Sequence, residues 1–279
     1  MRAASHSLTS IHLCMTTLTT NYPINDFMKF IVTGSEGFIG KALTQFLRNL
    51  GHSVIGYDRM TGREAEDIVH TLCADKIDGV FHLAAQTSVW NSDTEQICRD
   101  NIATFIKVCD TCSKYGVKLV YASSSTAYQG NTTSMYGLSK RFCEQYAAIY
   151  NRSATGIRFH NVYGKEPRQG TLLAHCLSDK PITLYNNGMN VRHFTYIGDI
   201  VEAAYYAMFS DQRILNAYNP EQTTVLEFVD LVRKYRAVDY ERVSKLRDFD
   251  CIEQSVDNWI FNVPLQYTSV ADGIMKVFS

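Results

Sequence analysis

A phenol and an ammonium group lie four residues apart in the segment Tyr136-Gly-Leu-Ser-Lys140. In a helix this spacing places both side chains on one face, one turn apart. Tyrosine is a poor base at neutral pH, but a neighbouring Lys⁺ favours its phenolate form, which can accept a proton. The serines at 123–125, which end an apolar strand-like run, offer a hydroxyl to complete such a site. The same spacing is common in ordinary amphipathic helices, so its meaning depends on the rest of the chain.

Three glycines, Gly34, Gly37 and Gly40, lie between an apolar run at 29–32 and a helical pattern at 38–50. A strand, a glycine turn and a helix in this order are typical of a dinucleotide-binding unit. The first glycine allows the tight turn, the second lets the backbone approach a pyrophosphate, and the third lets the helix pack on the strand. The N-terminus of the helix favours the negative charge of the diphosphate. We therefore expect a bound dinucleotide here.

Asp58 ends the next apolar run, at 53–57, about 20 residues after the glycine turn. A carboxylate at this distance accepts hydrogen bonds from the adenosine ribose and repels a 2′-phosphate. The preferred cofactor is therefore NAD rather than NADP. The neighbouring Arg59 weakens that preference, because a guanidinium attracts a phosphate.

Apolar runs and helical patterns alternate along the first part of the chain, which predicts an α/β fold with ligand bound at the carboxyl ends of parallel strands. We expect a doubly wound parallel-sheet Rossmann domain over 28–164 and a small C-terminal α/β substrate lobe that takes up most of 165–279. The expected strands are 29–32, 53–57, 79–85, 118–123 and 155–160, with helices at 38–50, 64–72, 93–115 and 135–150; the second lobe has shorter pieces at 171–177, 182–185, 199–209 and 225–235.

The composition excludes several classes of function. With a net charge of −1, the 279-residue chain has no basic excess for nucleic acid. No apolar stretch reaches the roughly 18 residues needed to span a bilayer, so no membrane partner is expected. Residues 1–27 are rich in Ser and Thr and are expected to be a disordered tail or to follow an upstream start codon, with a transit peptide as the alternative.

The eight cysteines are spread through apparent core elements, and the sequence has no secretory signal. Reduced thiols and a cytoplasmic location are the simpler interpretation. Cys109 and Cys112 form one Cys-x-x-Cys inside a helical pattern. Because no second pair is near in the sequence, no metal site is expected.

Seven motifs together make the chain similar to the extended short-chain dehydrogenase/reductase family, the nucleotide-sugar epimerases and dehydratases. The resemblance covers about residues 28–278. It rests on Thr33-Gly-Ser-Glu-Gly-Phe-Ile-Gly40, His82-Leu-Ala-Ala85, Asn101, Ser123-Ser-Ser-Thr-Ala-Tyr128, Tyr136-Gly-Leu-Ser-Lys140, Arg158-Phe-His-Asn-Val-Tyr-Gly164 and Arg192-His-Phe-Thr-Tyr-Ile-Gly-Asp199.

The resemblance implies a role for each matching residue. Tyr136 would be the acid/base, Lys140 would hold the nicotinamide ribose, and Ser124 would hydrogen-bond the reacting sugar hydroxyl. Arg192 would pair with the substrate diphosphate, with a surface salt bridge as its alternative. The residues expected to contact NAD are Gly34, Gly37, Phe38, Ile39, Gly40, Asp58, Arg59, Leu83, Ala84, Ala85, Asn101, Ala122, Tyr136, Lys140 and His160; those expected to contact a nucleotide-diphosphate sugar are Gln86, Ser125, Asn161 and Arg192.

The residues after Ser124 limit the reaction. Relatives that remove water from the sugar look as if they need an Asp-Glu pair there, whereas this chain has Ser125 and Thr126, which are not acids. The resemblance then favours 4-epimerisation, in which NAD oxidises the sugar to a 4-keto intermediate and returns the hydride to its other face. An NAD(P)-dependent reductase or dehydrogenase of the same fold and a non-catalytic nucleotide-binding scaffold stay open as alternatives.

Relatives commonly form homodimers through two helices, which here are 93–115 and 135–150. This chain also departs from its relatives. The loop between Ser124 and Tyr136 is short, so a wall of the usual site is expected to be missing. The strand that normally follows the second helix is expected to be reduced to 67–69 or lost.

Overall fold

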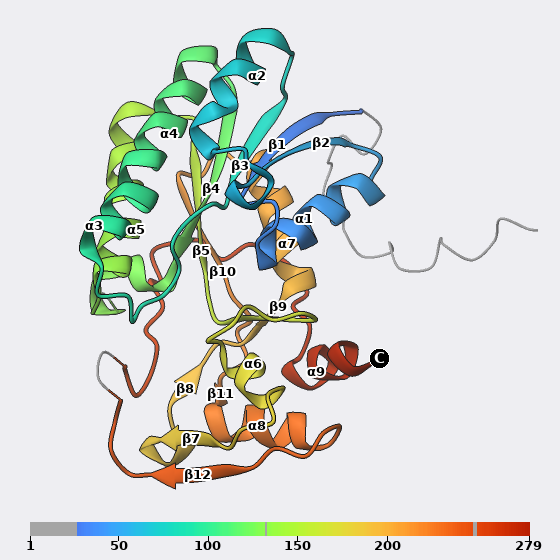
Figure 1. The fold of residues 1–279 in the computed structure, drawn as a ribbon, viewed down its shortest axis with the longest axis vertical. Coiled ribbons are helices and arrows are strands. Elements are labelled where there is room, and N and C mark those ends of the chain that lie inside the picture. The colour runs from blue at the N-terminus through green and yellow to red at the C-terminus, as the bar shows by residue number, and fades with distance from the viewer. Residues whose placement is uncertain (1–26, 132, 248–249) are drawn as a thin grey trace, which may run out of the picture.

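The computed structural model describes residues 27–131, 133–247 and 250–279 (Figure 1). Its centre is a six-stranded sheet in which every pairing is parallel. The strand order is β10 (Ile214–Ala217), β5 (Thr155–Phe159), β4 (Lys118–Ser124), β3 (Gly79–His82), β1 (Lys29–Thr33) and β2 (Ser53–Tyr57). The chain runs outward from β1 in both directions, so the crevice between β1 and β3 is the point where such folds bind ligands.

Helices cover both faces of this sheet (Figure 1). On one side, α1 (Phe38–Asn49) packs against α7 (Ile197–Met208). On the other side, α2 (Ile68–Ala74), α4 (Thr104–Tyr115) and α5 (Met135–Tyr150) pack in a row. The predicted doubly wound α/β fold is confirmed.

The helix expected at 93–115 has three parts. It begins with α3 (Thr94–Ile97), passes through a π-helical turn at Cys98–Ala103, and continues as α4. A π turn inserts an extra residue and often accompanies a functional site. Here the turn carries the buried side chains of Asp100 and Asn101, and Asp100 lines the cavity described below.

No further strand lies between β2 and β3 within the described residues, so β2 is the edge of the sheet. Residues 67–69, the expected remnant of that strand, lie in a helical turn and in the start of α2. Their helical conformation has a packing reason, because it buries Ile68 completely in the cluster formed with Val108 and Cys112 of α4. The alternative of a lost strand is therefore the correct one.

The small lobe has its own hydrophobic core, which includes Leu184, Phe194, Phe228 and Ile274. Its elements are β6 (Val162–Tyr163), α6 (Leu172–Cys176), β7 (Ile182–Tyr185), β8 (Val191–Arg192), β9 (Thr195–Tyr196), β11 (Thr223–Thr224), α8 (Val225–Arg233), β12 (Tyr240–Val243) and α9 (Val270–Phe278). The pairs β7–β12, β8–β11 and β6–β9 make three two-stranded sheets.

Two elements beyond residue 164, strand β10 and helix α7, belong to the main domain and not to the small lobe. Strand β10 pairs with β5, and α7 packs on α1, β4 and β5. The small side chains of Ala203, Ala204 and Ala207 allow this close approach and are fully buried there. The division at 164 stays a prediction, but the placement of residues 199–209 in the substrate lobe was wrong.

Residues 1–26 lie outside the described part of the chain, and so does the prediction of a disordered tail. No helix among residues 27–131, 133–247 and 250–279 has the length and apolar character needed to cross a bilayer. Cys109 and Cys112 are fully buried in α4, where burial raises the pKa of the Cys109 thiol to about 12. In the same described ranges, no cluster of His, Cys, Asp and Glu could hold a metal ion.

Candidate active site

A cavity of about 850 Å³ lies at the carboxyl ends of the central strands, with the small lobe forming its far wall. Most residues predicted to touch cofactor or substrate line it. These are Gly34, Gly37, Phe38, Ile39, Gly40, Asp58, Arg59, Leu83, Ala84, Ala85, Gln86, Ala122, Ser124, Ser125, Tyr136, Lys140 and Asn161.

The glycine turn forms one end of the cavity and fits a diphosphate. Gly34 has φ +70°, and a Cβ there would lie 2.7 Å from the backbone nitrogen of Ala84. A Cβ on Gly40 would collide with the carbonyl of Gly34, so the start of α1 lies directly on the turn. No side chain caps α1 and its first turn has no acid, which leaves its N-terminal N–H groups for an anion.

Asp58 stands at the expected ribose position. Its carboxylate accepts hydrogen bonds from the backbone nitrogens of Glu36 and Met60, both at 3.0 Å. These two bonds tie the end of β2 to the glycine turn and leave carboxylate lone pairs for ribose hydroxyls. The residues fit an adenosine ribose without a 2′-phosphate.

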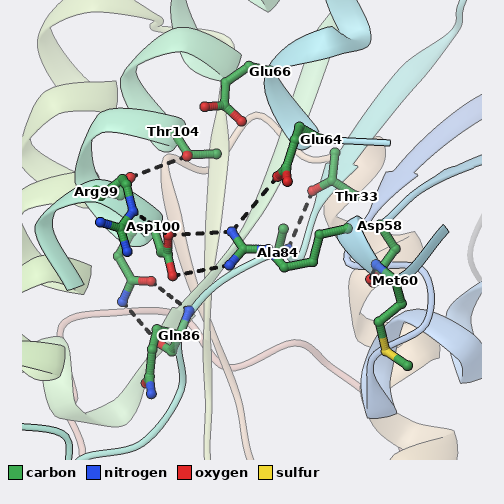
Figure 2. Close-up of polar contacts among 12 residues, drawn as sticks. Thr33, Asp58, Met60, Glu64, Glu66, Ala84, Gln86, Arg99, Asp100 and Thr104 are labelled. Atoms are coloured by element: carbon green, nitrogen blue, oxygen red, sulfur yellow. Dashed lines mark hydrogen bonds and ion pairs between the residues drawn. The ribbon is translucent and has the colours of Figure 1, made fainter. Parts of the chain in front are cut away.

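Arg59 is paired with two acidic neighbours, Glu64 and Asp100, which Figure 2 labels. Its two terminal nitrogens each lie 3.4 Å from an oxygen of Asp100, and Nη2 lies 3.8 Å from Glu64. A hydrogen bond to Asp100 is the main cause that raises the pKa of Arg59. The charge of the Arg59 guanidinium is already balanced by these carboxylates, so it is less available to a 2′-phosphate. In the sequence Arg59 weakened the preference for NAD, whereas its contacts in the structure support that preference.

The residues predicted to be the acid–base groups, Ser124, Tyr136 and Lys140, all line this cavity. Strand β4 ends at Ser124, and α5 begins one residue before Tyr136, capped by the hydroxyl of Ser134. Lys140 Nζ donates to the carbonyl of Ala122 at 2.9 Å and lies 5.9 Å from the centre of the Tyr136 ring. Both side chains are buried, so the ammonium lies beside the phenol ring with little contact with bulk water.

The hydroxyl of Ser124 has a defined polarity. Its oxygen accepts from the backbone nitrogen of Thr126 at 3.2 Å and from the Thr126 hydroxyl at 2.9 Å. With its lone pairs used, Ser124 is left with a proton to donate toward the cavity. A donor of this kind suits a sugar hydroxyl oxygen that gives its own proton to Tyr136.

Asn101 supports the cavity from behind and does not line it. Its amide oxygen accepts from the backbone nitrogen of Gln86 at 2.7 Å, while its nitrogen donates to the Gln86 carbonyl at 2.9 Å and to the Ser139 hydroxyl at 3.0 Å. The bonds between Asn101 and Gln86 are drawn in Figure 2. Asn101 therefore joins the loop after β3 to helix α5. It was predicted to contact the cofactor directly, but it does not line the cavity.

Two further predicted residues also lie outside the cavity wall. His160 is buried, and burial lowers its pKa to about 3, so its ring is neutral. Arg192 forms an ion pair with Asp250 and donates to the carbonyl of Cys251 at 2.8 Å. The Arg192 guanidinium, which was predicted to bind the substrate diphosphate, is thus paired with a carboxylate of this chain. The carboxylate is available because the segment that begins at residue 250 lies beside β8.

Sequence reasoning missed several residues of the wall, among them Trp90, Arg168 and Gln254. Arg168 follows a recognised motif by four residues and could have been suspected as a cation near an anionic substrate. Gln254 has no local signal, because it enters the site from the last part of the chain.

Residues 30–219 match the family described as the NAD dependent epimerase/dehydratase family. Among curated relatives, "Protein CapI" of Staphylococcus aureus is 30% identical over 226 residues, which cover 63% of this chain and 68% of the relative. The "Uncharacterized UDP-glucose epimerase YtcB" of Bacillus subtilis is 28% identical over 74% of this chain and 81% of its own.

Solved structures with a similar fold include members of the same group of enzymes. The crystal structure of a UDP-glucose 4-epimerase with UDP-glucose from Thermotoga maritima superposes with a TM-score of 0.75 and 23% identity, and it covers 90% of this chain and 97% of that one. The predicted family resemblance and the predicted NAD cofactor are confirmed by the family match. By sequence, fold and the glycine, serine, tyrosine and lysine groups around its cavity, the chain belongs to the NAD dependent epimerase/dehydratase family.

Proposed function

We propose that the chain is a nucleotide-sugar 4-epimerase, which inverts C4 of the sugar by reversible hydride transfer. The distribution of carboxylates around the cavity carries this proposal. Among the described residues that line it, the acids are Glu36, Asp58, Glu64 and Asp100, all at the cofactor end. Beside Ser124, the cavity thus offers no carboxylic acid that could protonate a leaving hydroxyl.

The residues at hand are sufficient for oxidation and reduction at one carbon. When bound, NAD supplies the site that takes up a hydride and gives it back. Tyr136 accepts the proton of the C4 hydroxyl during oxidation and returns it after the sugar has turned. Ser124 donates a hydrogen bond to the same oxygen, and Lys140 keeps a positive charge beside the phenol.

The substrate class follows from the relatives and from the wall. Names of relatives include UDP-glucose and UDP-glucuronate epimerases, which supports a UDP-sugar. Gln86, Ser125 and Asn161 line the cavity near the serines, where they would contact the sugar. Arg168 also lines the wall and is a candidate to face the diphosphate.

The test is incubation of purified protein with NAD⁺ and UDP-glucose, UDP-galactose or their N-acetyl forms, followed by NMR of the sugars and absorbance at 340 nm. We expect C4 epimers to interconvert without net formation of NADH. Tyr136→Phe should abolish turnover, whereas Tyr150→Phe at the exposed end of α5 should keep it. Net formation of NADH, or consumption of NADH or NADPH that is added together with a keto-sugar, would indicate the dehydrogenase or reductase, and bound NAD without any turnover would indicate the scaffold.

We also propose a homodimer formed through α4 and α5, in a reducing, cytoplasmic setting. Along α5, Leu138, Phe142, Tyr146 and Ile149 recur at helical spacing on one outer face, and Leu138 and Ile149 are exposed. The cysteines of the described residues are free thiols, and most are buried.

A further inference from the structure

The segment 250–257 ties the small lobe to the main domain. At one end, Asp250 pairs with Arg192 of β8 and accepts from Asn190 at 3.0 Å. At the other end, Asp257 pairs with Arg158 of β5 at 3.0 Å. Both arginines are largely buried, so these are firm anchors and not surface contacts. The segment crosses the cavity between two fixed points.

The same segment fills the place left by the short loop after Ser124. Asn131 donates to the carbonyl of Ser255 at 2.6 Å and accepts from the Ser255 backbone nitrogen at 3.1 Å. The wall predicted to be missing is therefore supplied by residues from the far end of the chain.

Gln254 is the residue of this segment that reaches the sugar end of the cavity. Its amide nitrogen donates to the hydroxyl of Ser125 at 2.6 Å, and its amide oxygen accepts from the side-chain nitrogen of Asn161 at 2.5 Å. Gln254 and Ser125 are both buried and line the cavity. One amide thus joins two residues that are candidates for contact with the sugar.

The direction of these bonds decides what Ser125 can offer a ligand. A hydroxyl that accepts from an amide N–H still has its own proton to donate. Among the residues that the structure describes, none accepts that proton from the Ser125 hydroxyl, and Ser125 lines the cavity. Ser125 is thereby set as a donor beside Ser124, which is a donor of the same kind.

We propose that Gln254 is a positioning residue for the substrate: through Asn161 and Ser125 it fixes the Ser125 hydroxyl as a hydrogen-bond donor to a sugar oxygen other than the C4 hydroxyl. This role rests on the proposed epimerase function, since it assumes a sugar in this part of the cavity. A glutamine suits it because the nitrogen of its amide donates to the serine while the oxygen accepts from the asparagine.

The test is a double-mutant cycle between Gln254→Met and Ser125→Ala, read as KM and kcat for UDP-glucose and UDP-galactose. Methionine keeps the length of the side chain without its hydrogen bonds. Gln254→Met should raise KM about 3- to 10-fold, the worth of one hydrogen bond, with kcat nearly unchanged. In the Ser125→Ala background the same substitution should change KM less than twofold, because the donor it positions is gone.

A matched variant tests the polarity. In Gln254→Glu both side-chain oxygens accept, so Ser125 must turn its proton away from the sugar, and KM should rise at least as much as in Gln254→Met. NAD⁺ affinity and thermal unfolding serve as controls for a merely structural effect and should stay within a factor of two and a few degrees of the wild type. Equal effects of Gln254→Met with and without Ser125 would overturn the proposal, as would an unchanged KM.

The same cycle can be run without turnover, by calorimetric titration of UDP-glucose and UDP-galactose into Tyr136→Phe protein with NAD⁺. If the wild type binds these sugars but makes no C4 epimer, the proposed function fails while the Kd cycle still decides the role of Gln254. If the epimers form but the cycle is additive, only the role of Gln254 fails.

Discussion

Arg59 directs both of its terminal nitrogens to the buried carboxylate of Asp100, at 3.4 Å each. The pair comes from opposite sides of the crevice, with Arg59 after β2 and Asp100 in the π turn before α4. A guanidinium held in this way already has a carboxylate partner, which competes with a 2′-phosphate for it. Asp58 and the partner of Arg59 therefore both disfavour a 2′-phosphate at the ribose end of the cavity.

Replacing Asp58 should reduce the preference for NAD. In Asp58→Ala the charge-assisted bonds to the ribose are lost, so NAD⁺ affinity should fall about 10- to 100-fold while NADP⁺ binding changes little. Asp58→Asn keeps one acceptor oxygen, so its NAD⁺ affinity should lie between that of the wild type and that of Asp58→Ala. Fluorescence titration with both dinucleotides measures the ratio, and unchanged NAD⁺ binding in Asp58→Ala would contradict this account of the ribose site.

Asn101 should be needed for the order of the loop after β3. Asn101→Leu leaves the backbone nitrogen and carbonyl of Gln86 without partners, which should cost about 2–4 kcal/mol of unfolding free energy. Urea unfolding measures this cost. Ser139→Ala removes only the third bond and is the matched control, expected at or below about 1 kcal/mol. Limited proteolysis should cut first within 86–93 in Asn101→Leu and not in the control.

The local pattern was enough to predict the elements that carry the catalytic groups. Helix α5 lies where predicted because its apolar periodicity and its cap at Ser134 both act over a few residues. The glycine turn, Asp58 and the end of β4 were predicted for the same reason, since each lies at the end of an apolar run in the sequence. Their convergence then follows from the parallel sheet, which brings all strand ends to one edge.

Contacts between distant parts of the chain could not be predicted in this way. Gln254 lies 129 residues from Ser125 and 93 from Asn161, and no periodicity links them. Arg192 forms a buried salt bridge and not the surface salt bridge given as its alternative, and its partner Asp250 lies 58 residues away. The helical spacing of apolar residues over 93–115 also could not show which of them are buried in the core and which lie at the surface. In the structure Ile97 and Phe105 are buried, and Ile102 is only partly buried.

The outer face of α5 should hold two copies of the chain together. Ile149 is exposed and lies on the same helical face as Phe142 and Tyr146. Ile149→Arg places a charge in such an interface and should convert a dimer into a monomer at micromolar concentration. Light scattering after gel filtration measures this, with Met275→Arg on the exposed side of α9 as the control. A wild-type monomer would contradict the proposed assembly.

Stability should fall as the solution becomes mildly acidic, because buried histidines, His82 and His160 above all, must stay neutral. Burial, with the nearby charge of Lys140, lowers the pKa of His82 to about 3, and burial next to His193 lowers that of His160 to about 3. The unfolded chain takes up these protons near pH 6.5, while the folded chain does not, so stability is complete above that pH and is lost as the pH falls toward 3. At pH 5.5 the two histidines together should cost about 3 kcal/mol relative to pH 8. Urea unfolding of His160→Asn should show a shallower dependence between pH 5 and 7, whatever its stability at pH 8. His70→Asn, at an exposed position of α2, should keep the wild-type slope, and equal slopes in all three proteins would contradict the assignment.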